Sequence, residues 1–315
     1  MKKPGDSHFF TAALFGLVFA FAAMPAAAGV QPVYLYNLAD FTGTVAYDSP
    51  RVVADRERNE IYVLYRNTVR VFNDAGMEVY RFGIADPERI QDVAVNAGGN
   101  ILTLVSRGTE FRVTQSNYRG EPLETTISAG DVKQLFPSFS PNRMVYHDGL
   151  LYLVDMNQML IVIMDEQGRR VRNQYDVAAI LKLEEEERAD SGMGGFSVDR
   201  EGNMVFTIPV FFKAYRLSPD GSIASFGQPG SVPGKFNIAR GIARDSKGNY
   251  LVVDVGKYGV MIFDSAFRFV TQFGSDKGRP GELISPRNVE VDAQDRVYVS
   301  QARNKGVSVF RLLYD

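Results

Sequence analysis

The stretch Gly241-Ile-Ala-Arg-Asp-Ser-Lys-Gly-Asn-Tyr-Leu-Val-Val-Asp254 decides the fold, because its pattern recurs along the chain. A second clear copy is Asn288-Val-Glu-Val-Asp-Ala-Gln-Asp-Arg-Val-Tyr-Val-Ser300. Each copy consists of a short apolar strand, an Asp, a polar turn and a second apolar strand. A third strand follows in both copies, at Val260–Phe263 and at Val307–Phe310. Short strands bounded by Gly, Asn and Asp turns, with no long amphipathic helix between them, indicate antiparallel sheets rather than βαβ units.

The same unit extends back through the chain with decreasing fidelity. The residues that end the first strand of each unit are Asp55, Asn96, His147, Asp199, Asp245 and Asp292, at intervals of 41, 51, 52, 46 and 47 residues. Four-stranded units of this length are typical of β-propeller blades. The sequence therefore predicts an all-β fold, a six-bladed β-propeller.

The two ends of the repeat region predict how the ring closes. The sixth unit ends at Tyr314 after only three strands, and a β-rich stretch, Pro32–Tyr36, precedes the first unit. This N-terminal strand is expected to complete the last blade, because closure removes the open edge that a ring of sheets would otherwise leave.

The repeat resembles a known family. The pattern Gly-Ile-Ala-x-Asp-x-x-Gly-Asn-x-x-Val-x-Asp, followed by a strand ending in Phe and by Phe273-Gly274, resembles the NHL repeat. The resemblance covers essentially the whole chain after residue 28 and is most specific in the last two units. The Asp that commonly ends the second strand in this family is retained only as Asp155 and Asp254. Such a resemblance implies a propeller and does not by itself imply a function.

The first 28 residues have the three regions of a secretory signal peptide. Lys2 and Lys3 are basic, Phe9–Met24 is apolar, and Ala26–Ala28 provides small residues for cleavage after Ala28. The apolar run is shorter than the roughly 20 residues that a spanning helix needs. We expect residues 1–28 to be a signal peptide and 29–315 a single propeller domain. The mature protein is then periplasmic or secreted, without a membrane span.

Composition excludes several function classes. The chain has no Cys, which excludes disulfides, thiolate metal sites, iron–sulfur clusters and a Cys nucleophile. Of two His, His8 lies in the expected leader, so His147 alone cannot form a multi-histidine metal site. With 35 Lys and Arg against 37 Asp and Glu, no excess charge attracts nucleic acid. These counts favour a protein that is not an enzyme and that carries no cofactor.

A polar, cationic mouth is expected at the start of the inner strands. The residues four or five positions before each anchor include four arginines, whose planar donor forks suit carboxylate, phosphate or an acidic partner. The simpler alternative is that these arginines bond to backbone carbonyls of the neighbouring blade. The candidate binding residues at this mouth are Arg51, Asp92, Asn142, Arg143, Arg240, Arg287 and Asn288.

Two insertions around the third unit are expected on the same rim, beside this mouth. Asp131–Phe136 predicts one or two helical turns, and Asp176–Asp190 predicts a longer helix. Four acids at a helix C-terminal end oppose the helix dipole, so this helix should fray unless a partner binds it. The candidate partner-binding residues are Glu184, Glu185, Glu186 and Glu187, although such a run is more often a solvated helix face.

Two further features are expected to be structural. The aromatic stretch containing Phe211, Phe212 and Tyr215 is explained by packing between blades, with a surface patch as the alternative. His147 replaces an Asp at a turn position and is expected to make the same turn hydrogen bonds.

Three functions remain open. The favoured one is a non-catalytic scaffold that binds a protein partner of the envelope or exterior through the channel-mouth face and the insertions. The second is a hydrolase or lactonase-like enzyme that holds a divalent cation such as Ca²⁺ with Asp92, Asn142, Asn288 and Glu290. Related propeller enzymes imply this oxygen-ligand chemistry. The third is binding of a small anionic ligand or polysaccharide at the arginines.

Overall fold

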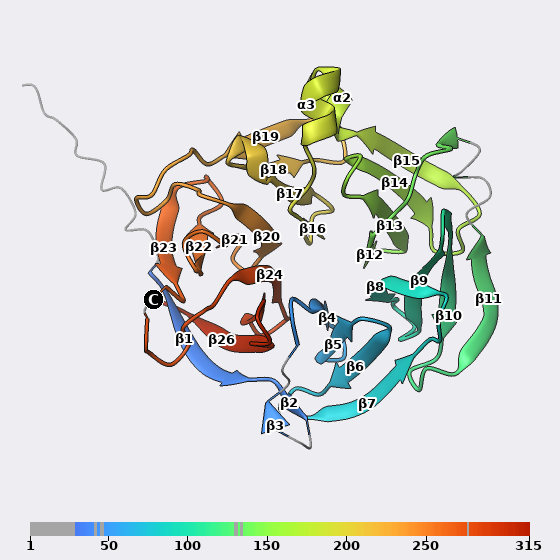
Figure 1. Ribbon diagram of the computed structural model, residues 1–315, viewed down its shortest axis with the longest axis horizontal. Helices are drawn as coiled ribbons and strands as arrows, with labels where there is room; N and C mark the ends of the chain where they lie inside the picture. The colour runs from blue at the N-terminus through green and yellow to red at the C-terminus, as the bar shows by residue number, and fades with distance from the viewer. Residues whose placement is uncertain (1–28, 41–42, 45–46, 129–131, 133–134, 276) are drawn as a thin grey trace, which may run out of the picture.

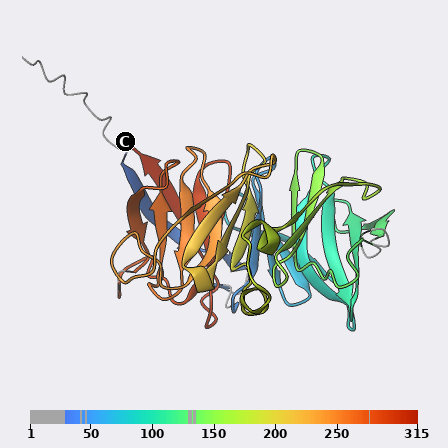
Figure 2. The same ribbon diagram turned by 90° about the horizontal axis from the view of Figure 1, so that it is seen from above.

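The computed structural model describes residues 29–315 except 41–42, 45–46, 129–131, 133–134 and 276. Its strands form six antiparallel four-stranded sheets, arranged as blades around a common axis (Figure 1). Seen edge-on, the blades make up a disc (Figure 2). The predicted signal peptide lies outside the described residues and stays a prediction. In the described part of the chain, no helix is long and apolar enough to cross a membrane.

Blades 1 to 5 are each built in chain order, blade 6 is completed by the N-terminal strand, and in every blade the strand that follows the inter-blade connection lies nearest the axis (Figure 1). Blade 1 contains β4 (Arg51–Asp55), β5 (Glu60–Tyr65), β6 (Thr68–Phe72) and β7 (Glu78–Gly83). Blade 2 contains β8 (Arg89–Val95), β9 (Ile101–Arg107), β10 (Glu110–Ser116) and β11 (Pro122–Ser128). Blade 3 contains β12 (Arg143–His147), β13 (Leu150–Asp155), β14 (Leu160–Asp165) and β15 (Val171–Asp176).

The other three blades follow the same plan. Blade 4 contains β16 (Gly195–Val198), β17 (Met204–Ile208), β18 (Lys213–Leu217) and β19 (Ile223–Phe226), with a 3₁₀ turn, η1 (Pro209–Phe211), before β18. Blade 5 contains β20 (Ala239–Arg244), β21 (Tyr250–Asp254), β22 (Gly259–Phe263) and β23 (Phe269–Phe273). Blade 6 contains β24 (Pro286–Val291), β25 (Arg296–Gln301), β26 (Val307–Tyr314) and β1 (Val30–Asn37).

The predicted closure of the ring is confirmed. β1 pairs antiparallel with β26 from Val30 opposite Tyr314 to Asn37 opposite Ser308 (Figure 1). Tyr34 of β1 packs edge-on against Phe310 of β26 with ring centroids 5.6 Å apart. The first and last strands of the repeat region thus share one sheet. A two-stranded ladder of β2 (Ala39–Asp40) and β3 (Gly43–Thr44) follows β1.

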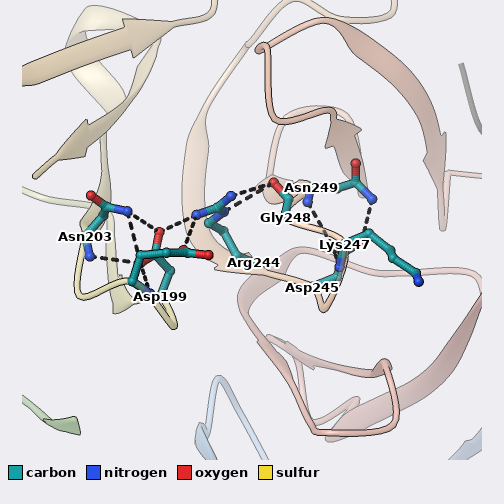
Figure 3. Close-up of polar contacts among 8 residues, drawn as sticks. Asp199, Asn203, Arg244, Asp245, Lys247, Gly248 and Asn249 are labelled. Carbon is teal, nitrogen blue, oxygen red and sulfur yellow. Dashed lines mark hydrogen bonds and ion pairs between the residues drawn. The ribbon is translucent and has the colours of Figure 1, made fainter. Parts of the chain in front are cut away.

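The turn after the inner strand depends on its Asp. In blade 5, Asp245 Oδ1 accepts the backbone N–H groups of Lys247 at 2.9 Å and Asn249 at 2.8 Å (Figure 3). These bonds satisfy turn amides that the ladder leaves unpaired, which explains why Asp and Asn recur there. Equivalent bonds to the turn are made by Asp55, Asp199 and Asp292.

Blade 3 departs from this turn, and the prediction for His147 is wrong. His147 pairs directly with Leu150 in the ladder, so only Asp148 and Gly149 form the turn, at φ of 48° and 73°. A two-residue turn of this type has no further amides for a side chain to cap. The imidazole makes no hydrogen bond to any residue that the structure describes.

The longer insertion forms two short helices rather than one. α2 (Val177–Ile180) begins after Asp176, whose Oδ1 accepts the Ala179 N–H at 3.0 Å, and α3 (Glu185–Asp190) begins after Glu184. Lys182, between them, has a φ of 57°, which interrupts the helix.

The glutamates therefore lie at the opposite helix end from the one predicted. Three of them occupy the first turn of α3, and the Glu187 carboxylate accepts the Glu184 N–H at 3.1 Å. Acidic side chains at a helix N-terminus are favoured by the dipole, so the prediction of a frayed acidic end is wrong.

The placement of the insertions also differs from the prediction. α2 and α3 lie on the outer circumference between blades 3 and 4, not beside the axis (Figure 1). In the shorter insertion, Val132 and Leu135 are helical, and the Phe136 N–H bonds to the Val132 carbonyl at 2.8 Å. Asp131, Lys133 and Gln134 of the predicted turn lie outside the described residues.

The aromatic stretch of blade 4 packs as expected. Tyr215 is buried and stacks on Phe206 with ring centroids 5.2 Å apart, and Phe211 and Phe212 are half-buried against the clusters between blades. Apolar burial between neighbouring sheets is the main favourable contribution to the fold.

Candidate functional site: the channel and the outer faces

Four charged side chains from four inner strands meet in the channel. Arg51 Nε lies 3.2 Å from Asp92 Oδ1, and Arg143 Nη1 lies 3.5 Å from Asp92 Oδ2. Arg51 Nη1 lies 3.7 Å from Glu290 Oε2. The residues come from β4, β8, β12 and β24, and their formal charges cancel. We refer to Arg51, Asp92, Arg143 and Glu290 as the channel cluster.

Burial dominates the electrostatics of the channel cluster. Asp92 is fully buried and also accepts the N–H groups of Val93 at 3.0 Å and Met144 at 2.9 Å. Burial, and then the neighbouring Arg51, lower the pKa of Arg143 to about 10. Burial raises the pKa of Glu290 above its usual value. The expected cationic mouth is therefore wrong at Arg51 and Arg143, whose charges are neutralised by carboxylates rather than offered to a ligand.

The other predicted mouth residues do not join the channel cluster. Asn142 Oδ1 accepts the Met156 N–H at 3.1 Å, and the Asn288 N–H bonds to Ser300 Oγ at 3.2 Å. Arg240 is exposed and Arg287 half-buried, and neither guanidinium forms an ion pair with a described residue. Two of the four arginines thus remain available at the start of the inner strands of blades 5 and 6.

The oxygen set proposed for a divalent cation does not assemble. The carboxylates of Asp92 and Glu290 are engaged by arginines, and the Asn142 amide oxygen caps a backbone N–H. Among the described residues, no three His, Asp or Glu side chains are grouped so that they could hold a metal ion.

Two glycines explain why the channel cluster is confined to blades 1, 2, 3 and 6. A Cβ at Gly195 would lie 2.6 Å from the Arg240 carbonyl oxygen, and one at Gly241 would lie 2.7 Å from Asn288 Cα. The inner strands β16, β20 and β24 therefore approach too closely for any side chain at these positions. A glycine four residues before the anchor of a unit, as in these two units, is the sequence signal for this close approach.

The main cavity along the channel extends toward the opposite end of the inner strands. It has a volume of about 220 Å³ and includes Arg51 and Glu290 in its wall. Its remaining lining comes largely from the ends of the inner strands and the turns that follow them: Asp55 to Glu57, Asn96, Ala97 and Tyr146 to Asp148. His147 thus lines a cavity rather than capping a turn, at the end of the inner strands opposite to most of the predicted mouth residues.

The turns around this end are joined by polar contacts between blades. In Figure 3, Arg244 of blade 5 reaches Asp199 of blade 4 and also bonds to the Gly248 carbonyl. Asn203 holds the same Asp199 carboxylate at 3.0 Å. Other joints are bridged by Ser246 to Asp295, Arg56 to the Val291 carbonyl, Arg58 to the Ala97 carbonyl and Asn96 to Glu166. Many of the polar side chains at this end therefore serve to hold neighbouring blades together.

A surface that the sequence analysis missed lies at the other end, over blades 4 and 5. Val210 is 50% exposed, Val232 54%, Ile238 43% and Tyr258 47%. We call these four residues the blade 4–5 face. Exposed apolar residues gathered on one face are the usual mark of an interaction site.

Three connections place the four residues at the same end of the disc. Val210 lies in the β17–β18 connection, Val232 and Ile238 between β19 and β20, and Tyr258 between β21 and β22. The Val255 N–H bonds to the Ile238 carbonyl at 3.0 Å, and Lys257 Nζ bonds to the Ser231 carbonyl at 3.2 Å. Because strands in a blade alternate in direction, these connections share one end of the disc with the start of each inner strand.

The acidic insertion is also accessible. Glu184 to Glu187 are all exposed on α3, at the outer circumference of the same blade 4 joint. Among the described residues, these glutamates contact the backbone at the helix start described above, and the basic residue of α3, Arg188, pairs with Asp176 at 2.9 Å rather than with a glutamate. The structure therefore leaves these carboxylates in solvent without assigning them a partner.

Comparison with known proteins identifies the fold. No family model and no curated protein matches the chain. A catalytically inactive histidine-to-alanine variant of virginiamycin B lyase from Staphylococcus aureus, with quinupristin, superposes with a TM-score of 0.59 at 12% identity, covering 91% of this chain and 100% of that one. A luciferin-regenerating enzyme gives 0.60 at 10%, covering 90% and 95%. A protein of unknown function from Bacteroides thetaiotaomicron gives 0.60 at 14%, covering 90% and 76%. At these identities, the likeness shows a shared six-bladed propeller and nothing finer.

Proposed function

We propose that this protein is an NHL-type propeller that acts as a non-catalytic scaffold in the periplasm or outside the cell. It binds a protein partner through the end of the disc that carries the inter-blade connections. The observation that carries this proposal is the blade 4–5 face, whose four large apolar side chains are about half exposed. The self-neutralised channel cluster supports it, because the charges that could have served a reaction or an anion are used to pair each other.

The charges around this face favour an acidic partner. Arg240 is exposed beside Ile238, and Lys257 lies next to Val232. The connection 227–238 contains one Lys and no Asp or Glu. An apolar centre with a cationic border suits a partner surface that has apolar anchors and carboxylates.

The test is gentle purification from the native envelope, followed by mass spectrometry of what co-purifies. We expect one protein in stoichiometric amount with the wild type, and its loss with Val232→Asp or Tyr258→Asp. The matched control is Met77→Asp, which places the same charge on an equally exposed apolar residue of blade 1. A partner retained by both face variants, or no partner at all, would refute the proposal. A mature N-terminus at Gly29 would support the proposed export.

A second candidate is an enzyme, a lyase or a lactone hydrolase, whose site is the channel cavity. One observation favours it: His147, Tyr146 and Glu290 all line this cavity. The superposed virginiamycin B lyase is inactive when a histidine is replaced by alanine. If this candidate is correct, cleavage of a lactone substrate is lost in His147→Ala and unchanged in Val232→Asp and Tyr258→Asp.

A further inference from the structure

A second concave site lies on the outer wall between blades 4 and 5. It is a groove of about 640 Å³, within the range of ligand sites in proteins. Its walls come from the end of β19, the connection that follows it, and the turn between β22 and β23. The residues that matter for its chemistry are Phe226, Phe263, Phe267, Phe269, Lys213 and Lys235.

Phe267 occupies a backbone position that other blades give to glycine. It is the fourth residue of the turn between the third and fourth strands, and its N–H bonds to the Asp264 carbonyl at 2.9 Å. The same bond is made in blades 1 to 4 by Gly76, Gly120, Gly168 and Gly221, with φ between 67° and 86°. Phe267 holds a φ of 66°, which is an outlier for a bulky residue.

This strained backbone holds an aromatic ring in the groove. The Phe267 ring stacks on Phe226 of blade 4 with centroids 4.7 Å apart and an interplanar angle of 10°. Stacking offsets part of the strain, yet four other turns form without an aromatic residue. Strain that persists at one copy of a repeat points to a function of that copy. The stacked rings of Phe226 and Phe267 form an aromatic floor of the groove, to which each blade contributes one ring.

The rest of the groove combines aromatic and cationic groups. Phe269 is 37% exposed and packs closely against Gly234. A Cβ added at Gly234 would lie 2.9 Å from the Cβ of Phe269. The Lys235 side chain crosses Gly230, where a Cβ would lie 2.7 Å from the lysine Cδ. Lys213 is exposed, and neither lysine forms an ion pair with a described residue. No Asp or Glu lines the groove.

We propose that this groove binds an acidic peptide segment that carries an aromatic side chain. The aromatic ring packs against Phe267 and Phe269, and flanking carboxylates pair with Lys213 and Lys235. Offset stacking and charge-assisted hydrogen bonds are the contacts that these groups offer. The groove borders the blade 4–5 face along the connection 227–238. Phe267 lines only the groove, whereas Val232 and Tyr258 belong only to the face, so variants at these residues distinguish the two proposals.

The experiment is selection of a displayed library of random heptapeptides on the full mature protein. We expect enrichment of sequences with Phe, Tyr or Trp next to Asp or Glu. Binding of the enriched peptides should fall about tenfold or more in Phe267→Gly and in the double variant Lys213→Gln, Lys235→Gln. The double variant should also remove most of the salt dependence of binding.

The variants are chosen so that unfolding does not imitate the result. Phe267→Gly installs the residue that the four other turns use but also removes the ring contacts with Phe226 and Tyr250, so its melting temperature is measured beside its binding. The double lysine variant leaves these contacts intact and is the second test. Lys277→Gln, an exposed lysine away from the groove, is the matched control and should bind normally. The proposal is overturned if no aromatic–acidic peptides are enriched, or if the enriched peptides bind the groove variants as well as the wild type. Peptides that depend on Val232 and Tyr258 but not on Phe267 would support the blade 4–5 face and overturn the groove.

Discussion

Both carboxylate oxygens of Asp92 have partners in the channel. The sequence predicted an open cationic mouth at this position, whereas the structure has a paired carboxylate. Each oxygen lies near one arginine and accepts one backbone N–H. A buried carboxylate needs such partners, because desolvation of an unpaired charge is costly. The arginines at the start of two inner strands are therefore parts of the fold, although the same residue types suit an anion site equally well.

Glu290 makes the stability of the protein depend on pH. Burial raises its pKa above the ordinary value of 4.5, so the folded state binds more protons than the unfolded state between the two values. Stability contributed by protonated Glu290 is present below pH 4.5 and is lost as the pH rises through the raised pKa. In Glu290→Gln this loss is absent, so the melting temperature of the variant relative to the wild type should increase from pH 4 to pH 7.

The control for this trend is Glu88→Gln. A hydrogen bond from Arg112 lowers the pKa of Glu88, so its stabilising contribution is present above the ordinary pKa and is lost as the pH falls. The relative melting temperature of Glu88→Gln should therefore decrease as the pH rises. Parallel trends in the two variants would contradict the role assigned to burial of Glu290.

At the scale of elements, β1 is the strand that lies farthest in sequence from the other strands of its own blade. It pairs along its length with β26 and covers the outer edge of blade 6. Exposed edge strands template association with other chains, so natural propellers cover them.

Removing residues 29–37 should leave β26 as an open edge. We expect the truncated chain to self-associate more than the full chain and to unfold at a lower temperature, as measured by light scattering and calorimetry. As a control, Val33→Lys and Leu35→Lys change only exposed side chains of β1 and should leave the association state of the full chain unchanged. A truncated chain with the same association state and the same stability as the full chain would show that closure by β1 is dispensable.

The α2–α3 insertion also shows what local patterns determine. The sequence predicts one helix over Asp176–Asp190, whereas the structure has two short helices there, the first of which is capped by Asp176. The break at Lys182 moves the glutamates from a helix end to a helix start, and no residue pattern in that stretch announces it.

At the scale of the whole molecule, the ring is held by contacts between blades as well as by closure. Arg244 joins blades 4 and 5 by pairing with Asp199, and its guanidinium lies 4.8 Å from the Tyr250 ring. Because each such contact joins only two blades, its loss is expected to loosen those two blades without unfolding the ring. Amide hydrogen exchange detects local opening of this kind.

Arg244→Gln should loosen the joint between blades 4 and 5 alone. We expect faster amide exchange in the inner strands and turns of those two blades and unchanged exchange in blades 1 and 2. Arg268→Gln is the control. The Arg268 side chain is 72% exposed, so its ion pair with Asp264 contributes about 1 kcal/mol or less to stability. Uniformly faster exchange across all six blades would show that the joint is not a local unit.

The number of blades, the four-stranded sheets, the turn Asp residues and the closing strand could all be predicted from the amino-acid sequence. These features follow from periods of apolar residues and from local hydrogen bonds, which are written in short stretches of chain. The sequence also placed Arg51, Asp92, Arg143 and the region of Glu290 near one another, because equivalent positions of a repeat meet at the axis.

The contacts of these residues could not be predicted from the sequence, because they depend on how the blades pack. Whether an arginine faces a ligand or a carboxylate depends on distances between strands far apart in the sequence, as Arg51, Asp92 and Glu290 show. The exposure of Val232 and Tyr258, and the groove under Phe267, likewise arise where separate connections meet. Pairing and exposure are properties of the assembled surface, so local patterns predict the ring while the packing of the blades selects its sites.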